Sequence, residues 1–166
     1  AGLGSSAAVV VAGIDAATRA LGEPLDRREL AERAYRAEFE VQDGQASRAD
    51  TFCSAMGGAV RVEGDDCAPV DAPSLPFVVG FDGGAGDTGE LVAGVRELRA
   101  RHAFAADTVA SIGDVVRTGE ELLAAADPGA DAPPGLLDEL GALMDFNHGL
   151  LSALGVSARS LDAMVW

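Results

Sequence analysis

The stretch that most restricts the fold of this chain is Ala-Gly-Leu-Gly-Ser-Ser-Ala-Ala at residues 1–8, which runs directly into the apolar residues 9–14. Gly2 and Gly4 permit backbone conformations that other residues rarely adopt. Ser5 or Ser6 can cap a helix that continues to about Leu21, where a glycine and a proline follow. A turn of this kind either caps an ordinary helix or binds an anion through free N–H groups and the helix dipole.

The same stretch leaves the choice between a helix cap and an anion site open. The two glycines let the backbone approach a ligand closely, and the two serines offer hydroxyls to a phosphate or to its magnesium. The lysine of a Walker A loop is missing, and no strand precedes the glycines as in a dinucleotide-binding turn. The residues therefore allow a phosphate site without identifying its class.

Further along, the pattern predicts a helix from Asp26, which can cap it with Glu29 as partner. Its expected apolar stripe consists of Leu30, Ala34, Ala37 and Val41. A short helix is expected within residues 46–58, where two glycines end it, and a strand at 59–63 follows from its alternating pattern. Residues 64–76 are acidic and rich in proline, which predicts a surface loop.

The second half of the chain is mainly helical in pattern. Residues 77–81 predict a buried strand, and residues 82–87 a glycine-rich turn. A helix is then expected to open at Thr88, with Leu91, Val92, Val95 and Leu98 on one face. Further helices are expected at 107–126, 134–154 and from 157 onward, with a linker at 127–134. Strands and helices followed by helices alone indicate an α+β class.

The composition is acidic and lacks lysine. The 166 residues carry 27 acidic and 12 basic side chains, a net charge of −15, and every basic residue is an arginine. Such a surface repels nucleic acid and anionic membranes, and it indicates adaptation to high salt, where counterions screen self-repulsion. No apolar run is long enough to cross a bilayer. We expect a halophilic, cytoplasmic protein with neither a nucleic acid nor a membrane as partner.

Cysteine and histidine give no sign of a metal centre. Cys53 and Cys67 lack metal-type spacing, so we expect two free thiols in a reducing compartment. His102 and His148 have no metal-ligand partner at helical spacing. Zinc and iron sites are therefore not expected.

A second candidate site is the segment Ala-Ser-Arg-Ala-Asp-Thr at residues 46–51. Asp50 is expected at the start of a short helix, where the helix dipole favours its charged form. An ionised carboxylate there could orient a substrate hydroxyl or accept its proton. The alternative is that Asp50 or Ser47 merely caps the helix.

A third candidate is the acidic pair Glu38 and Glu40, expected near the end of the second helix. A carboxylate close to a phosphate loop is a natural ligand for Mg²⁺, which prefers oxygen ligands and keeps several waters. A solvated helix end is the alternative.

Together, these segments resemble the GHMP family of small-molecule kinases. Residues 2–8 are similar to its phosphate loop, P-x-G-x-G-L-G-S-S-A, and residues 46–58 to the segment that carries its catalytic aspartate and ends in Gly-Gly. Residues 87–96 and 144–157 resemble T-x-x-L-V-x-x-V-R and M-x-x-N-x-x-L-L-x-x-L-G-V-S of its mevalonate kinase branch. The form Ala-Ser-x-x-Asp-Thr-Phe is most similar to the archaeal members.

The resemblance implies a GHMP kinase fold, α+β in class and only partly covered by this chain. Residues 1–72 would be the second half of the N-terminal ATP-binding domain, which is ribosomal protein S5 domain 2-like. Residues 73–166 would be the first part of a helical, ferredoxin-like C-terminal domain. A lysine-bearing strand before the chain and a loop G-A-G-G-G-G-C after it would complete the enzyme. We therefore expect the fragment alone to be inactive.

The resemblance also implies a reaction, the transfer of the ATP γ-phosphate to the 5-hydroxyl of mevalonate. Asp50 would be the base or would orient the hydroxyl, Ser6 and Glu38 would bind Mg²⁺, and Ser47 and Thr88 would contact the substrate. The ATP phosphates would be lined by Gly2, Leu3, Gly4, Ser5, Ser6 and Ala7.

The sequence departs from the family's usual motif spacing, and alternatives remain for the magnesium ligand and for the function. Asp43-Gly44 adds a residue between the glutamate pair and the Ala-Ser segment, so Glu40 rivals Glu38 as the magnesium ligand, although Glu38 is favoured. Another GHMP kinase, acting on phosphomevalonate or a sugar, is the second hypothesis, and a non-catalytic module that keeps the fold is the third. The sequence leaves a homodimer open.

Overall fold

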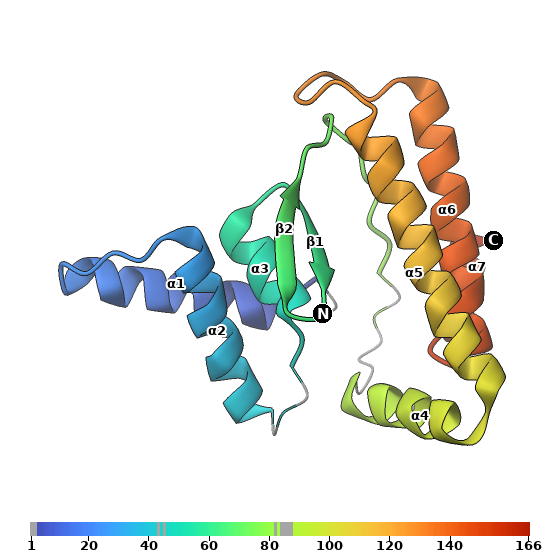
Figure 1. The fold of residues 1–166 in the computed structure, drawn as a ribbon, viewed down its shortest axis with the longest axis horizontal. Helices are drawn as coiled ribbons and strands as arrows, with labels where there is room; N and C mark the ends of the chain where they lie inside the picture. The colour runs from blue at the N-terminus through green and yellow to red at the C-terminus, as the bar shows by residue number, and fades with distance from the viewer. Residues whose placement is uncertain (1–2, 43, 45, 82, 84–87) are drawn as a thin grey trace. The chain divides into compact units, whose positions relative to one another are not determined.

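The computed structural model describes residues 3–42, 44, 46–81, 83 and 88–166. The chain divides into two compact units, residues 1–71 and 72–166, which are described separately below. The first contains α1 (Ser5–Ala20), α2 (Arg27–Val41), α3 (Arg48–Met56), β1 (Ala59–Glu63) and β2 (Asp66–Val70). The second contains α4 (Thr88–Arg101), α5 (Ala103–Ala124), α6 (Pro134–Ala153) and α7 (Arg159–Val165), as Figure 1 shows.

Helix α1 begins with the glycine turn, but its cap differs from the expectation. The N-cap residue is Gly4, in the left-handed conformation with φ 64°, and no side chain caps the helix. Ser5 and Ser6 are already helical, so neither is the cap that the sequence predicted, and the Ser6 hydroxyl has another partner. The helix ends as expected, with Leu21 at the C-cap and Gly22 at φ 78°.

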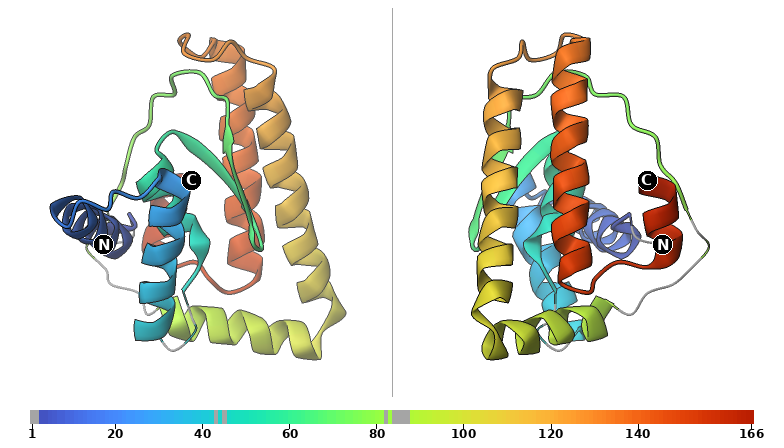
Figure 2. Two further views of the ribbon diagram at one scale, coloured as in Figure 1. Left: turned by 60° about the vertical axis from the view of Figure 1, so that its left-hand side comes forward. Right: turned by 90° about the vertical axis from the view of Figure 1, so that its right-hand side faces the viewer.

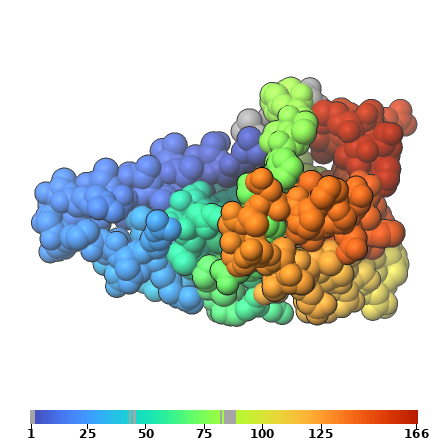
Figure 3. Space-filling model, turned by 90° about the horizontal axis from the view of Figure 1, so that it is seen from above, coloured from blue at the N-terminus to red at the C-terminus, as the bar shows by residue number. Residues whose placement is uncertain are grey.

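Helix α2 packs beside α1 (Figure 3) and starts as predicted. The Asp26 side chain accepts a hydrogen bond of 2.8 Å from the backbone N–H of Glu29. Leu30 and Ala34 are buried with Val11 of α1 in one apolar cluster. Val41 is 84% exposed, which contradicts its place in the predicted stripe, because the buried row near the end of α2 is continued by a glutamate instead.

Helix α3 and the hairpin form a second cluster with α2. Ala31, Phe52 and Cys67 are buried together, from α2, α3 and β2 in turn. Strands β1 and β2 pair antiparallel with Glu63 opposite Asp66, so Gly64 and Asp65 form a two-residue turn. The prediction of a surface loop at 64–76 was therefore wrong for β2. The buried Cys67 and the glycine turn outweigh the charges and prolines, because Pro69 lies on a two-stranded ribbon that tolerates it.

The second unit is helical, with α5 and α6 side by side (Figure 2). Helix α5 starts at Ala103 rather than at Asp107, since His102 takes the extended N-cap conformation, and it ends at Ala124 rather than at Ala126. Residues 125–133 connect it to α6. The backbone of Ser74 joins this connection through hydrogen bonds to Ala130 and Ala132 of 2.7 and 3.1 Å.

The predicted buried strand at 77–81 is not formed. These residues are in irregular structure, and the side chains of Phe77, Val78, Val79 and Phe81 are 64–101% exposed. A strand needs neighbours for its N–H and C=O groups, and no described segment of the second unit supplies one. The predicted turn at 82–87 lies outside the described residues except for Gly83.

Cys53 and Cys67 are both free thiols, as expected. Among the described residues, no helix has the length and apolarity needed to cross a membrane.

Candidate active site

The turn before α1 presents unpaired backbone donors. Hydrogen bonding within the helix begins with the N–H of Ala8, which donates to the carbonyl of Gly4 at 3.0 Å. The N–H groups of the preceding turn have no acceptor within the helix, and they lie at the positive end of its dipole. Leu3 and Ser5 are exposed at this turn, whereas Ala7 is 1% exposed and packs inward. Gly2 lies outside the described residues.

Ser6 and Glu38 meet at the start of α1. The Ser6 hydroxyl donates a hydrogen bond of 2.6 Å to Oε1 of Glu38. Glu38 is only 7% exposed, whereas Glu40 is exposed on the same helix. No basic side chain in the described part of the chain forms an ion pair with Glu38. Buried charged groups are stabilised by hydrogen bonds, by a partner charge or by a metal ion, and here the Ser6 hydroxyl supplies a hydrogen bond.

Asp50 faces the glycine turn from α3. It lies in the first turn of that helix, and its side chain is exposed. A β-carbon placed on Gly4 would lie 3.3 Å from Cγ and Oδ1 of Asp50. The positive φ of Gly4 and this close approach both favour glycine at position 4.

The structure also places the two predicted substrate residues. Ser47 is the N-cap of α3 in extended conformation, and its side chain makes no capping hydrogen bond. Asp50 is helical and not the cap residue. Thr88 begins α4 in the second unit, and its side chain is not among those described. Of the predicted set, Gly4, Ser6, Glu38 and Asp50 are the residues that the structure brings together.

This donor set suits a cation that shares its ligands with a phosphate. Among the described residues, no three His, Cys, Asp or Glu side chains lie close enough to hold a metal ion by themselves. The Ser6 hydroxyl and the Glu38 carboxylate are hard oxygen ligands. Mg²⁺ is usually held by one or two carboxylates together with waters and substrate phosphates, so these residues fit it.

Two residues near Asp50 were missed by the sequence reasoning. Arg48, at the start of α3, contacts Glu32, Tyr35 and Asp65, which are distant in sequence, and no spacing rule could have indicated that convergence. The pKa of the Cys53 thiol is raised by burial and by the nearby charge of Asp50.

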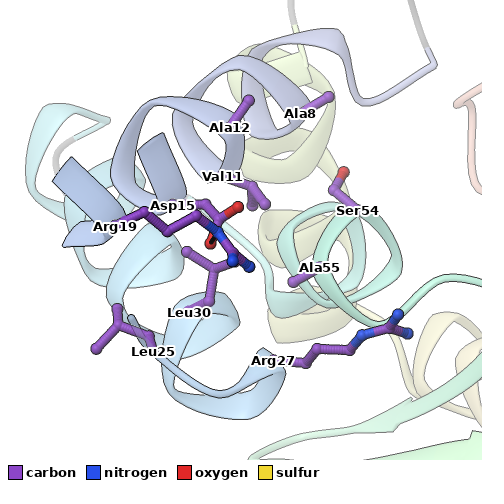
Figure 4. Close-up of a pocket in the computed structure, with 10 residues that line it drawn as sticks. All are labelled: Ala8, Val11, Ala12, Asp15, Arg19, Leu25, Arg27, Leu30, Ser54 and Ala55. Atoms are coloured by element: carbon purple, nitrogen blue, oxygen red, sulfur yellow. Dashed lines mark hydrogen bonds and ion pairs between the residues drawn. The ribbon is translucent and has the colours of Figure 1, made fainter. Parts of the chain in front are cut away.

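A separate hollow lies between α1, α2 and α3. It has a volume of about 400 Å³ and is lined by apolar side chains such as Val11 and Leu30 together with polar ones, among them the paired Asp15 and Arg19 (Figure 4). None of the predicted site residues lines this hollow, so we do not assign the chemistry to it.

Comparison with known proteins gives a family match over the segment that contains the candidate site. Residues 1–58 match the family described as GHMP kinases N terminal domain, a region that contains all four converging residues. The chain is 41% identical to a mevalonate kinase from Thermococcus gammatolerans, over 100% of this chain and 48% of that protein. This chain belongs to the GHMP kinase family.

Other relatives carry the same description. The chain is 37% identical to a mevalonate kinase from Pyrococcus furiosus, over 100% of this chain and 48% of that protein. It is 35% identical to one from Archaeoglobus fulgidus, over 99% of this chain and 52% of that protein. The chain thus spans about half the length of the curated relatives that it matches. No solved structure gives a significant match.

Proposed function

We propose that this GHMP kinase chain belongs to a protein that transfers the γ-phosphate of ATP to the 5-hydroxyl of (R)-mevalonate. The product would be 5-phosphomevalonate, an intermediate of isoprenoid biosynthesis. The observation that carries the proposal is the convergence of Ser6, Glu38 and Asp50 at the glycine turn of α1. The curated relatives named above, which are described as mevalonate kinases, support the choice of acceptor.

Phosphate binding would fall to the first turn of α1. Backbone N–H groups of residues 5–7 and the dipole of α1 favour an anion at this end of the helix. Gly4 keeps the approach open, because any side chain there would fill the space in front of Asp50. Leu3 and Gly2 would contribute backbone only.

Ser6 and Glu38 would hold Mg²⁺ beside these phosphates. The ion supplies charge neutralisation for the phosphates and their leaving oxygen. The short hydrogen bond between Ser6 and Glu38 already holds the hydroxyl and carboxylate oxygens side by side. The buried position of Glu38 gives it preference over Glu40 as the magnesium ligand.

Asp50 would act on the acceptor. Its carboxylate would orient the 5-hydroxyl in line with the γ-phosphorus and accept the hydroxyl proton as the new O–P bond forms and the bond to ADP breaks. Ser47, exposed at the N-cap of α3, and Thr88, at the start of α4, would contact the substrate. We also infer a cytoplasmic protein adapted to high salt, in line with its acidic composition.

The test is a kinase assay on the intact protein with Mg²⁺-ATP and a panel of mevalonate, phosphomevalonate, homoserine and galactose. Mevalonate should be the preferred acceptor. Asp50→Asn should lower kcat by about 10²–10⁴-fold, the usual contribution of a positioned acid or base. Asp71→Asn, an exposed aspartate of the same unit, is the matched control and should retain activity.

Two results would overturn the proposal. Preference for another acceptor would make the protein a different GHMP kinase. Full activity of Asp50→Asn, or no activity of the wild type with any acceptor, would favour a module that keeps the fold without the reaction.

A further inference from the structure

Arg48 makes three separate contacts from the first position of α3. Its Nε lies 3.2 Å from Oε1 of Glu32, and its Nη1 lies 2.6 Å from Oδ1 of Asp65. The guanidinium carbon lies 4.1 Å from the ring centroid of Tyr35. Glu32 and Tyr35 belong to α2, and Asp65 belongs to the turn between β1 and β2. One side chain therefore ties α3 to two other elements.

This position is unfavourable for a cation on local grounds. The N-terminus of a helix carries partial positive charge, so an arginine there lowers the intrinsic stability of α3. The contacts with Glu32 and Asp65 offset that cost, and they connect segments 16 and 17 residues apart in sequence. The Arg48 side chain thus stabilises the packing of α3 against α2 and the β1–β2 turn rather than α3 itself.

Both residues that these contacts join, Arg48 of α3 and Tyr35 of α2, are close in sequence to candidate site residues. Asp50 follows Arg48 by two positions on α3, and Glu38 follows Tyr35 by three positions on α2. The hydroxyl of Thr51, which is completely buried, donates a hydrogen bond of 3.2 Å to the carbonyl of Arg48. A displacement of Arg48 would therefore move the turn of α3 that carries Asp50.

We propose that Arg48 is a positioning residue for phosphoryl transfer, holding the Asp50 turn of α3 against the segment of α2 that carries Glu38. The inference rests on the proposed function. Arg48 does not bind substrate, because its guanidinium is occupied by Glu32, Asp65 and the face of Tyr35, and its side chain is only 18% exposed.

Arg61 provides a matched control. It also holds two carboxylates, with Nη1 2.9 Å from Glu63 and Nη2 2.7 Å from Asp66. All three residues lie within the β1–β2 hairpin. Replacing Arg61 by alanine removes a comparable pair of ionic contacts and leaves Arg48 with Glu32, Tyr35 and Asp65.

The experiment compares Arg48→Ala, Arg48→Lys and Arg61→Ala in the intact protein. For Arg48→Ala, kcat should fall by about ten- to a hundredfold, because a misplacement near 1 Å can cost that much, while KM for ATP and mevalonate should change by less than about threefold. Arg48→Lys keeps the positive charge but loses the planar guanidinium whose separate nitrogens reach Glu32 and Asp65. Its kcat should therefore lie between those of Arg48→Ala and the wild type. Arg61→Ala should keep the wild-type kcat.

Hydrogen exchange provides a readout that does not depend on activity. Arg48→Ala should accelerate exchange of the amides in α3 and in the last turns of α2, whereas Arg61→Ala should do so in the hairpin. Unchanged exchange in α3 would overturn the inference even if the protein proves to use another acceptor. A rise in KM for ATP with unchanged kcat would also overturn it, because Arg48 would then be a substrate-binding residue.

Discussion

The two units of this chain differ in the apolar side chains that they bury. In the first, polar side chains cross between elements, as Ser6 does to Glu38 and Arg48 to Glu32. Its buried apolar side chains are Ala7, Val11, Leu30, Ala31, Ala34, Phe52 and Cys67. In the second unit, Ala105 and Leu154 are buried, and large apolar side chains such as Val78, Phe146 and Trp166 are exposed.

The difference shows where the geometry of the candidate site is specified. The contacts that place Asp50 and Glu38 are made within residues 3–71 by α1, α2, α3 and the hairpin. The second unit carries residues 144–157, whose pattern is similar to M-x-x-N-x-x-L-L-x-x-L-G-V-S of mevalonate kinases. One polar cluster there joins His148 of α6 to Asp162 of α7 at 2.9 Å. Variants in the first unit therefore test the geometry of the candidate site, and variants in the second test the contribution of its polar cluster.

After the loss expected for Asp50→Asn, the largest expected effect concerns Gly4. Gly4→Val should lower kcat of the intact protein by about a hundredfold, because the new side chain displaces Asp50 and the positive φ is strained. Gly13→Ala is the control, since a β-carbon there meets no atom within 4 Å. It should leave kcat unchanged and raise the free energy of unfolding by up to about 1 kcal/mol. An active Gly4→Val enzyme would show that phosphoryl transfer does not require glycine at position 4.

The magnesium ligand gives the next effect. Glu38→Gln should raise the Mg²⁺ concentration needed for half-maximal rate by about tenfold or more, because it removes the charged ligand. Glu40→Gln should change it little, since Glu40 is exposed and has no hydrogen bond to Ser6 in the described structure. A titration of rate against Mg²⁺ at saturating ATP measures both. The opposite ranking of the two variants would assign the ion to Glu40.

A smaller effect concerns the two thiols of the first unit. Burial raises the pKa of Cys67, and partial desolvation together with the charge of Asp50 raises the pKa of Cys53. A thiol reagent should therefore modify the exposed Cys53 first. Asp50→Asn should speed this reaction by about two- to fivefold below the thiol pKa, because removing the negative charge favours the thiolate. An unchanged labelling rate would place Asp50 farther from Cys53 than the structure does.

The smallest effect tests the polar cluster of the second unit. Hydrogen bonds from Ser157 and then from His148 lower the pKa of Asp162 below its usual 3.8. A lowered carboxyl pKa stabilises the fold at pH values above 3.8, and this contribution is lost as the pH falls through the folded-state pKa.

Ser157→Ala should therefore lower the unfolding midpoint near neutral pH by a few degrees or less, and the deficit should shrink in acid. Fluorescence of Trp166, whose ring lies 6.0 Å from that of His148, can follow the transition. A deficit that persists unchanged at pH values well below 3.8 would mean that the hydroxyl acts through packing rather than through Asp162.

Local rules predicted those parts of the fold that depend on neighbouring residues. Asp26 caps α2, β1 alternates, and α4 starts at the residue that the pattern indicated. Features that depend on distant partners were missed. Strand β2 exists because Cys67 packs on Phe52, and residues 77–81 remain irregular because no described neighbour pairs with them.

The candidate site shows the same division. Gly4, Ser6 and Glu38 were singled out from the sequence because their residue types fit phosphate or metal binding. Asp50 was singled out because a carboxylate can orient a substrate hydroxyl or accept its proton. That Ser6 bonds to Glu38 and not to Glu40 depends on how α1 crosses α2, which spacing alone does not determine. The contacts of Arg48 were not predicted for the same reason.

The use of arginine without lysine has a consequence for charge balance. The chain has 27 carboxylates and 12 guanidinium groups, more than two acids for each base. Arg48 and Arg61 each bind two carboxylates through different nitrogens, which a single ammonium point charge does with less geometric definition. Each such guanidinium therefore bridges two carboxylates with one positive charge, so the pair keeps one net negative charge. A protein with this surplus of acid can thus cross-link its elements with few basic residues.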